Sequence, residues 1–270
     1  MFHFTSDFIN SADVKLHYYR TGGEKPALVL AHGITDDGLC WLPVAEALFD
    51  SFDVIMVDLR GHGLSEAPES GYTMENLARE LAELILGLGI HKPFVLGHSM
   101  GAATTLILAA LYPDLPRAIL LEDPPVIWRR DEQEKSANFR NSLGEWIDAN
   151  KRKTHGDLLA ECSKSGWPEN EIEPWINSKH RYSPRIRAFL DTREHDGVDL
   201  QALLRQITCP ALFIGGDQAR GAICGEPDIT ELKTIIPRLQ SVPIAGAGHN
   251  IRRDQFATYM KAVKEFLTRH

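Results

Sequence analysis

The sequence predicts an α/β protein with a mostly parallel sheet, because short apolar runs alternate with helical patterns along the chain. Strands buried on both faces of a parallel sheet carry continuous apolar side chains. Six runs of this kind lie at 27–31, 52–57, 94–96, 118–121, 211–214 and 239–244. Residues 2–9 and 14–19 alternate well enough to predict two antiparallel strands that begin the sheet. We therefore expect eight strands.

The stretches between these strands have helical periodicity. Residues 74–88 (MENLARELAELILGL) repeat apolar side chains every three or four positions, and Thr73 is suited to cap the N-terminus of that helix. Residues 102–111 are small and apolar all round, which predicts a buried helix. Residues 256–267 are amphipathic and predict a final helix. Helices between parallel strands cover both faces of a sheet, so we expect a doubly wound domain.

Size and charge limit the classes of partner. The chain has 270 residues, 43% of them hydrophobic, which is enough for one large domain with a sizeable core. A net charge of -8 disfavours nucleic acid and anionic membranes as partners. The first twenty residues lack the basic and apolar segments of a signal peptide, and no apolar run is long enough to insert into a membrane. We expect a cytoplasmic monomer or homodimer whose four scattered cysteines are reduced thiols.

Residues 124–204 interrupt the alternation of strands and helices. They are polar and rich in arginine, with helical periodicity and no convincing strand. Four tryptophans favour a folded insertion over a disordered linker, namely Trp128, Trp146, Trp167 and Trp175. We therefore expect a core domain formed by 1–123 and 205–270, with a helical cap at 124–204 inserted after the strand at 118–121.

Ser99 lies in "FVLGHSMGA", between a predicted strand and a predicted helix. A serine at such a tight strand-to-helix turn adopts strained backbone angles and needs small neighbours, which Gly97 and Gly101 supply. The helix that follows directs its N-terminus at the hydroxyl and favours a developing negative charge there. The alternative is a serine that merely caps the helix. We favour a nucleophile because the buried strand and buried helix place the turn above the sheet.

Two further loops at strand ends complete a pattern for acyl transfer. "LVLAHGITDD" places His32 and Gly33 after a strand, where a loop N–H can help bind an oxyanion. We expect the oxyanion donors to be the backbone N–H groups of Ile34 and Met100. "AGAGHN" follows the last strand and delivers His249, which suits a general base C-terminal to its nucleophile.

These motifs together resemble the α/β-hydrolase superfamily, and its capped, esterase-like members in particular. The resemblance covers nearly the whole core through "LVLAHGITDD", "VIMVDLRGHGLSE", "VLGHSMGA" and "AGAGHNIRR", which occur in the expected order. It implies the α/β-hydrolase fold with a helical cap, Ser99 as nucleophile and His249 as base. It also implies a structural role for the loop that contains Asp58 and Arg60.

The acid of the triad has two candidates. In most relatives the acid follows the strand that corresponds to "ALFIGG", but the matching position here is Ala219. The nearest carboxylate is Asp217, two residues earlier. The other candidate is Asp123 in "AILLEDPP", a position that some branches of the superfamily use, although an aspartate before proline also suits a turn. We prefer Asp123, because the usual site is vacant, and keep Asp217 as the alternative.

The chemistry expected is cofactor-independent hydrolysis of a carboxylic ester or lactone through an acyl-enzyme. No phosphate-binding loop, dinucleotide motif or His/Cys cluster predicts a cofactor or metal. Carbon–carbon bond hydrolases and perhydrolases share the triad, and a ligand receptor of the same fold is a further alternative. The candidate substrate-binding residues are His32, His98, Trp41 and Trp128. Arginines of the insertion could steer an acidic substrate, although most are expected to lie on the surface: Arg129, Arg130, Arg181, Arg185 and Arg187.

Overall fold

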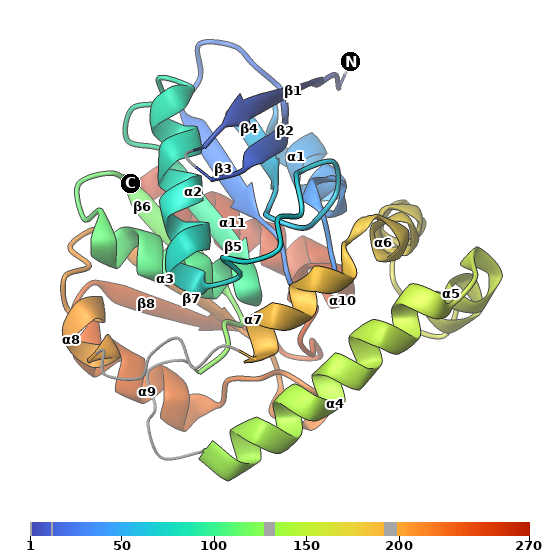
Figure 1. The fold of residues 1–270 in the computed structure, drawn as a ribbon. Helices are drawn as coiled ribbons and strands as arrows, with labels where there is room; N and C mark the ends of the chain where they lie inside the picture. Colours follow the sequence, from blue (N-terminus) through green and yellow to red (C-terminus); the bar gives the residue numbers. More distant parts are fainter. Residues whose placement is uncertain (1, 12, 127–132, 192–198) are drawn as a thin grey trace.

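The computed structural model describes residues 2–11, 13–126, 133–191 and 199–270; for 133–139 and 191 it describes the backbone alone. They form an eight-stranded sheet in the order β1-β2-β4-β3-β5-β6-β7-β8 (Figure 1). The antiparallel pairs are β1 with β2 and β2 with β4, while the other neighbours are parallel. The structure therefore confirms the prediction that two antiparallel strands begin a sheet that is otherwise mostly parallel.

The strands follow the predicted runs, with ends that differ by at most three residues. β1 begins at Thr5 rather than at residue 2, and β4 includes Asp58, which the apolar run leaves out. The bounds of the strands are β1 Thr5–Asn10, β2 Lys15–Arg20, β3 Ala27–Ala31, β4 Asp53–Asp58, β5 Phe94–His98, β6 Ala118–Glu122, β7 Ala211–Gly215 and β8 Leu239–Pro243.

The central strands alternate their apolar side chains between two cores, one on each face of the sheet. In β3, Val29 and Ala31 belong to the core beneath α2 (Met74–Gly87), α3 (Met100–Leu111) and α9 (Glu226–Ile235). Leu28 and Leu30 belong to the other core, beneath α1 (Leu42–Leu48) and α11 (Phe256–Arg269). The continuous apolar runs thus arise because both faces of each strand are covered.

In the residues that the structure describes, the segment between β6 and β7 consists of helices joined by turns and contains no strand. It contains α4 (Gln133–Arg152), α5 (His155–Cys162), α6 (Glu169–Arg181), the 3-10 helix η2 (Pro184–Arg187), α7 (Ala188–Asp191) and α8 (Leu200–Leu204). Figure 1 shows α4, α5 and α6 gathered at one side of the molecule. α5 and α6 share a small core of their own that contains Leu158, Trp175 and Ile176, with Trp167 packed against it.

Short elements complete the chain: the 3-10 helices η1 (Gly38–Trp41) and η3 (Gln218–Arg220), and α10 (Ile251–Asp254). Thr73 caps α2 as predicted, because its side chain accepts a hydrogen bond from the Asn76 N–H. Among the residues described, no helix is both long and apolar enough to cross a membrane.

The junction of β5 and α3 is packed so closely that side chains would not fit. A Cβ atom at Gly97 would lie 2.2 Å from the Gly101 carbonyl oxygen. A Cβ atom at Gly101 would lie 2.2 Å from the carbonyl oxygen of Ala31, in the neighbouring strand β3. These glycines therefore let the start of α3 approach the ends of both strands.

We expect Gly101→Ala to lower the free energy of unfolding by about 1–3 kcal/mol, because the new methyl group overlaps backbone atoms that cannot move freely. Urea denaturation measures this difference. Gly156→Ala is the matched control, since the nearest atom to its new Cβ in α5 is 3.8 Å away. Equal stability of the two variants would contradict the close packing of the junction.

Candidate active site

Ser99 occupies the turn between β5 and α3 in a strained conformation. Its backbone has φ 52 and ψ -117, and its side chain makes no capping hydrogen bond to α3. Its N–H donates to the carbonyl oxygen of Glu122 at the end of the adjacent strand β6 (2.9 Å). The serine hydroxyl is thus not used to cap the helix, and strain of this kind is concentrated at functional sites.

His249 and Asp123 meet from distant parts of the chain. The Nδ1 atom of His249 lies 2.7 Å from Oδ2 of Asp123. The Asp123 carboxylate is fully buried and also accepts backbone hydrogen bonds from Ile223 (2.8 Å) and Cys224 (3.1 Å). Like Ser99, Asp123 has a positive φ, of 41°. Lys92 is the only other non-glycine residue with a positive φ in the described part of the chain. These contacts fix a carboxylate against the imidazole, as general-base catalysis by histidine requires.

Asp217 has a different environment. Its side chain is exposed and accepts a hydrogen bond from the Ala219 N–H at the start of η3 (2.9 Å). Its own N–H donates to the carbonyl oxygen of Ala247, in the loop that carries His249 (2.7 Å). The backbone at Asp217 is therefore close to the histidine loop, while its carboxylate caps a local turn.

His98 ties the histidine loop to the serine turn. Its Nε2 lies 3.0 Å from the carbonyl oxygen of His249, and the two imidazole rings have centroids 4.7 Å apart. Burial, with the nearby charge of Arg252, holds the pKa of His98 well below its ordinary value, so the ring is neutral. A neutral ring that donates from Nε2 leaves Nδ1 unprotonated, and this buried atom has no partner among the described residues.

Three consecutive carbonyl groups of the loop at 33–36 are each held by a buried side chain. Gly33 lies beside Ser99, since a Cβ atom at Gly33 would be 3.5 Å from the Ser99 Cβ. The Gly33 carbonyl oxygen lies 2.8 Å from Nδ1 of His32, and that of Ile34 lies 2.6 Å from Nε2 of His62. The Thr35 carbonyl oxygen accepts from Lys179 of α6 (2.9 Å). The backbone that follows β3 is therefore fixed peptide by peptide.

The contacts of His32 set its proton and orient the next peptide. The Leu59 N–H donates to Nε2 (3.0 Å), so the proton of the neutral ring is on Nδ1 and is donated to Gly33. Burial lowers the pKa of His32 to about 3, which keeps the ring neutral. In a trans peptide the N–H points opposite to the carbonyl, so this bond turns the Ile34 N–H away from His32. The side chain of His32 holds the loop and is fully buried.

The other candidate binding residues that the structure describes are buried or form ion pairs with carboxylates. Trp41 is fully buried in the core beside α1, with the Arg252 guanidinium 4.3 Å from its ring centroid. Trp128 lies outside the described residues, as do Arg129 and Arg130. The other three candidate arginines of the insertion face carboxylates: Arg181 faces Asp37 (2.6 Å), Arg185 faces Glu69 (3.6 Å) and Arg187 faces Asp148 (2.6 Å).

Sequence reasoning did not find a cluster of buried charges beneath the site. Three acidic side chains (Asp36, Glu122 and Glu171) meet three basic ones (Lys179, Arg252 and Arg253), and each is at most 5% exposed. The signal was present in "ITDD" after the His-Gly pair and in "HNIRRD", which begins at His249. Charges in such strings usually lie on the surface, so only the tertiary structure shows that these are buried.

The described residues hold no group of three or more His, Cys, Asp or Glu that could bind a metal ion. The arrangement offers instead a strained serine, a histidine paired with a buried carboxylate, and a backbone loop fixed beside the serine. The sequence also matches a known family. The model of that family, which describes the alpha/beta hydrolase fold, matches residues 26–251. The chain belongs to the α/β-hydrolase fold family.

Relatives of this α/β hydrolase include enzymes with named activities. It is 31% identical to the N-formylmaleamate deformylase of Pseudomonas putida over 96% of this chain and 95% of that protein. It is 28% identical to the 2-(acetamidomethylene)succinate hydrolase of Mesorhizobium japonicum over 98% and 96%. Among solved structures, a thermophilic esterase from Thermogutta terrifontis with malate bound has a TM-score of 0.75 and 26% identity, covering 99% of this chain and 98% of that one. The protein is therefore a hydrolase, and its relatives differ in the bond they cleave.

We expect that, in His32→Gln, the free energy of unfolding will change less with pH in the acid range than it does in the wild type. Between pH 6.5 and about 3, the unfolded chain binds a proton at His32 that the folded protein excludes. The neutral histidine therefore contributes stability that is complete at neutral pH and is lost as the pH falls, by about 1.4 kcal/mol per pH unit. A glutamine amide can donate to Gly33 and accept from Leu59 without titrating.

Urea unfolding at pH 4, 5 and 6 measures the slope. The control is His155→Gln, at a histidine whose side chain is 49% exposed, and it should keep the wild-type slope. If His32→Gln shows that same slope, His32 is not the buried neutral group described here.

Proposed function

We propose that this α/β hydrolase cleaves an acyl compound through a covalent acyl-enzyme, with Ser99 as nucleophile, His249 as general base and Asp123 as acid. The observation that carries the proposal is the 2.7 Å contact between His249 Nδ1 and the buried Asp123 carboxylate, in a loop that His98 ties to the Ser99 turn. The exposed carboxylate of Asp217, which caps its own turn, supports Asp123 over that alternative. The pairing leaves Nε2 of His249 available to the serine hydroxyl.

The reaction follows from these positions. Ser99 Oγ attacks the acyl carbon as its proton passes to His249, and Asp123 stabilises the imidazolium that forms. The oxyanion is bound by the N–H groups of Ile34 and Met100, the second of which opens α3 and so has no partner inside the helix. His249 then protonates the leaving group as its bond to the acyl carbon breaks. In the second half, His249 takes a proton from the water that attacks the acyl carbon and returns it to Ser99 Oγ, as the C–Oγ bond breaks and the carboxylic acid leaves.

The names of the curated relatives favour a carbon–nitrogen bond over a simple ester. Both names describe carboxylate-bearing compounds with a formyl or acetyl group on nitrogen. We therefore place small acidic N-acyl compounds first among the substrates, and the carboxylic esters and lactones expected from the sequence second, in line with the structural similarity to an esterase. The same triad chemistry serves both, since only the leaving group differs.

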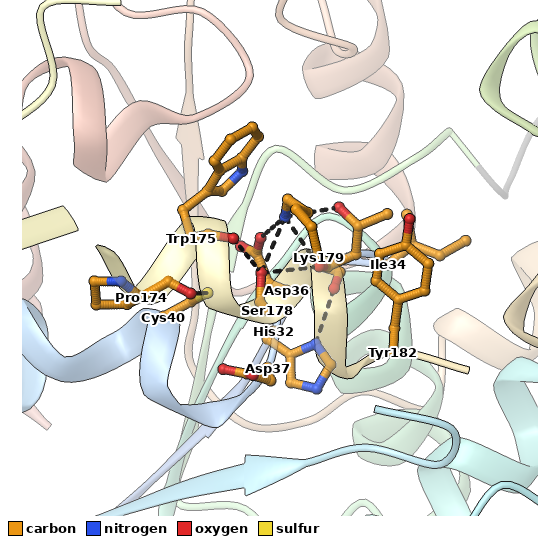
Figure 2. Close-up of polar contacts among 12 residues, drawn as sticks. His32, Ile34, Asp36, Asp37, Cys40, Pro174, Trp175, Ser178, Lys179 and Tyr182 are labelled. Carbon is orange, nitrogen blue, oxygen red and sulfur yellow. Dashed lines mark hydrogen bonds and ion pairs between the residues drawn. The ribbon is translucent and has the colours of Figure 1, made fainter. Parts of the chain in front are cut away.

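We further propose that residues 124–204 form a cap over this site. Its α6 supports the proposal, because Ser178 and Lys179 of that helix contact the carbonyl oxygen of Thr35, two residues from Gly33 beside the serine turn (Figure 2). A helix so placed can shield the acyl-enzyme from bulk water and line the pocket.

We expect wild-type protein to hydrolyse at least one member of a panel, and Ser99→Ala to lose about 10⁴-fold or more in kcat on that substrate. The panel is N-formylmaleamate, 2-(acetamidomethylene)succinate, and p-nitrophenyl acetate, butyrate and octanoate. Faster cleavage of the two amides supports the N-acyl class, and faster cleavage of the esters supports an esterase. A folded wild type that is inert on all five would contradict both, and ligand binding without turnover would favour a receptor.

We expect Asp123→Asn to lower kcat by about 10³–10⁴-fold, because an amide cannot stabilise the imidazolium or hold its tautomer. Asp217→Asn is the matched control, since it makes the same change in an exposed turn, and it should stay within about threefold of wild type. Steady-state kinetics on one substrate measures both, with circular dichroism to check folding. The reverse result would assign the acid to Asp217.

A further inference from the structure

Lys179, near the end of α6, is a fully buried cation whose ammonium group reaches the loop beside Ser99. It lies 2.9 Å from the Thr35 carbonyl oxygen, 3.0 Å from the Thr35 hydroxyl, 2.9 Å from Asp36 Oδ1 and 3.1 Å from the Ser178 hydroxyl. Its three protons are therefore matched by four acceptors (Figure 2). The side chain links the insertion to the loop that carries Ile34, across 144 residues of chain.

Asp36 anchors the other side of this contact. Its second oxygen lies 3.1 Å from Arg252 and 2.8 Å from Arg253, both in α10, which begins two residues after His249. Burial by itself raises the pKa of Asp36, but Arg253, Lys179 and Arg252 hold that pKa well below its ordinary value. The carboxylate is therefore charged and is paired with three cations. The loop is held between α10 of the core and α6 of the insertion.

Two residues of α6 enter this cluster, and they differ in one respect. Glu171 pairs with Arg253 (3.2 Å). Lys179 also pairs with a charge, but it alone of the two contacts the loop backbone, through Thr35. Removing either side chain changes the charge of the buried cluster by one unit. A comparison of substitutions at Glu171 and Lys179 therefore distinguishes an effect on the stability of the cluster from an effect on the position of the loop.

We propose that Lys179 is a positioning residue, which holds the Thr35 carbonyl and Asp36 and so fixes the Ile34 N–H for the oxyanion. This inference rests on the proposed function. The carbonyl of Gly33 is held by His32 and that of Ile34 by His62, both from the core, whereas the Thr35 carbonyl is held by Lys179 and Ser178 of α6. The docking of α6 thus completes the set of contacts that fixes the loop.

The test compares Lys179→Met with Glu171→Gln and with wild type, on the substrate that wild type cleaves fastest in the panel. We expect Lys179→Met to lower kcat about 10- to 100-fold with KM within threefold, because loss of one oxyanion donor costs 10²–10³-fold and a displaced donor costs less. Glu171→Gln should keep kcat within threefold. Equal losses of kcat in the two variants, or unchanged kcat in Lys179→Met, would overturn the inference.

Hydrogen exchange of the backbone amides at 33–37, read by mass spectrometry, gives a second measurement that needs no substrate. Faster exchange confined to this loop in Lys179→Met, and absent in Glu171→Gln, is the expected result, and unchanged exchange overturns the inference. If Lys179→Met does not fold, Ser178→Ala takes its place, since that hydroxyl accepts from Lys179 (3.1 Å) and shares its one proton between the carbonyl oxygens of Trp175 (2.7 Å) and Thr35 (3.1 Å). We expect its kcat to fall about threefold or more at unchanged KM, and an unchanged kcat counts against the inference.

Ser99→Ala separates the two hypotheses. If it abolishes activity while Lys179→Met does not lower it, the serine mechanism stands and the positioning role is wrong. If Ser99→Ala keeps full activity, the proposed function is wrong. The exchange measurement then decides by itself whether Lys179 holds the loop.

Discussion

The site depends on one backbone contact, the close approach of the first turn of α3 to the ends of β3 and β5. Gly97 and Gly101 make that approach possible, because a Cβ atom at either position would lie 2.2 Å from a carbonyl oxygen. The turn that results holds Ser99 at a positive φ, directly before the first residue of α3. The adjacent strand β6 then ends at the same level, where Asp123 also has a positive φ. Both strained residues lie where strand ends meet. The packing of the surrounding core offsets the free-energy cost of their strained backbones.

Burial of histidines gives the loop beside the serine its fixed shape. His32 and His62 are fully buried, and burial lowers the pKa of each. A neutral imidazole can donate only one hydrogen bond, and at His32 the Leu59 N–H decides which nitrogen keeps the proton. The aromatic rings of the two histidines also pack at 4.8 Å between centroids. The backbone that follows β3 is thus oriented by buried imidazoles, of which His32, with a pKa of about 3, stays neutral at neutral pH.

The charged cluster joins parts of the chain that are far apart in sequence. It links the loop after β3, the end of β6, the segment after His249 and α6 of the insertion. A buried cluster of this kind stabilises a protein little relative to apolar packing, whereas removing one member leaves an unpaired charge and is strongly destabilising. Its consequence is therefore geometric, since its ion pairs hold these four segments against one another.

The sequence by itself determined the elements and the chemical groups. Apolar runs located the parallel strands within two residues, because strands covered on both faces need continuous apolar side chains. Motif order singled out Ser99, His249 and the pair of candidate acids, while the polar composition and helical periodicity of 124–204 predicted a helical insertion after the strand at 118–121. Only the tertiary structure decided which carboxylate faces His249, because Asp123 and Asp217 both follow strands that end near the same loop. Only the tertiary structure revealed Lys179 and Asp36, because a charged residue in a helix or loop gives no local sign that distant segments will bury it.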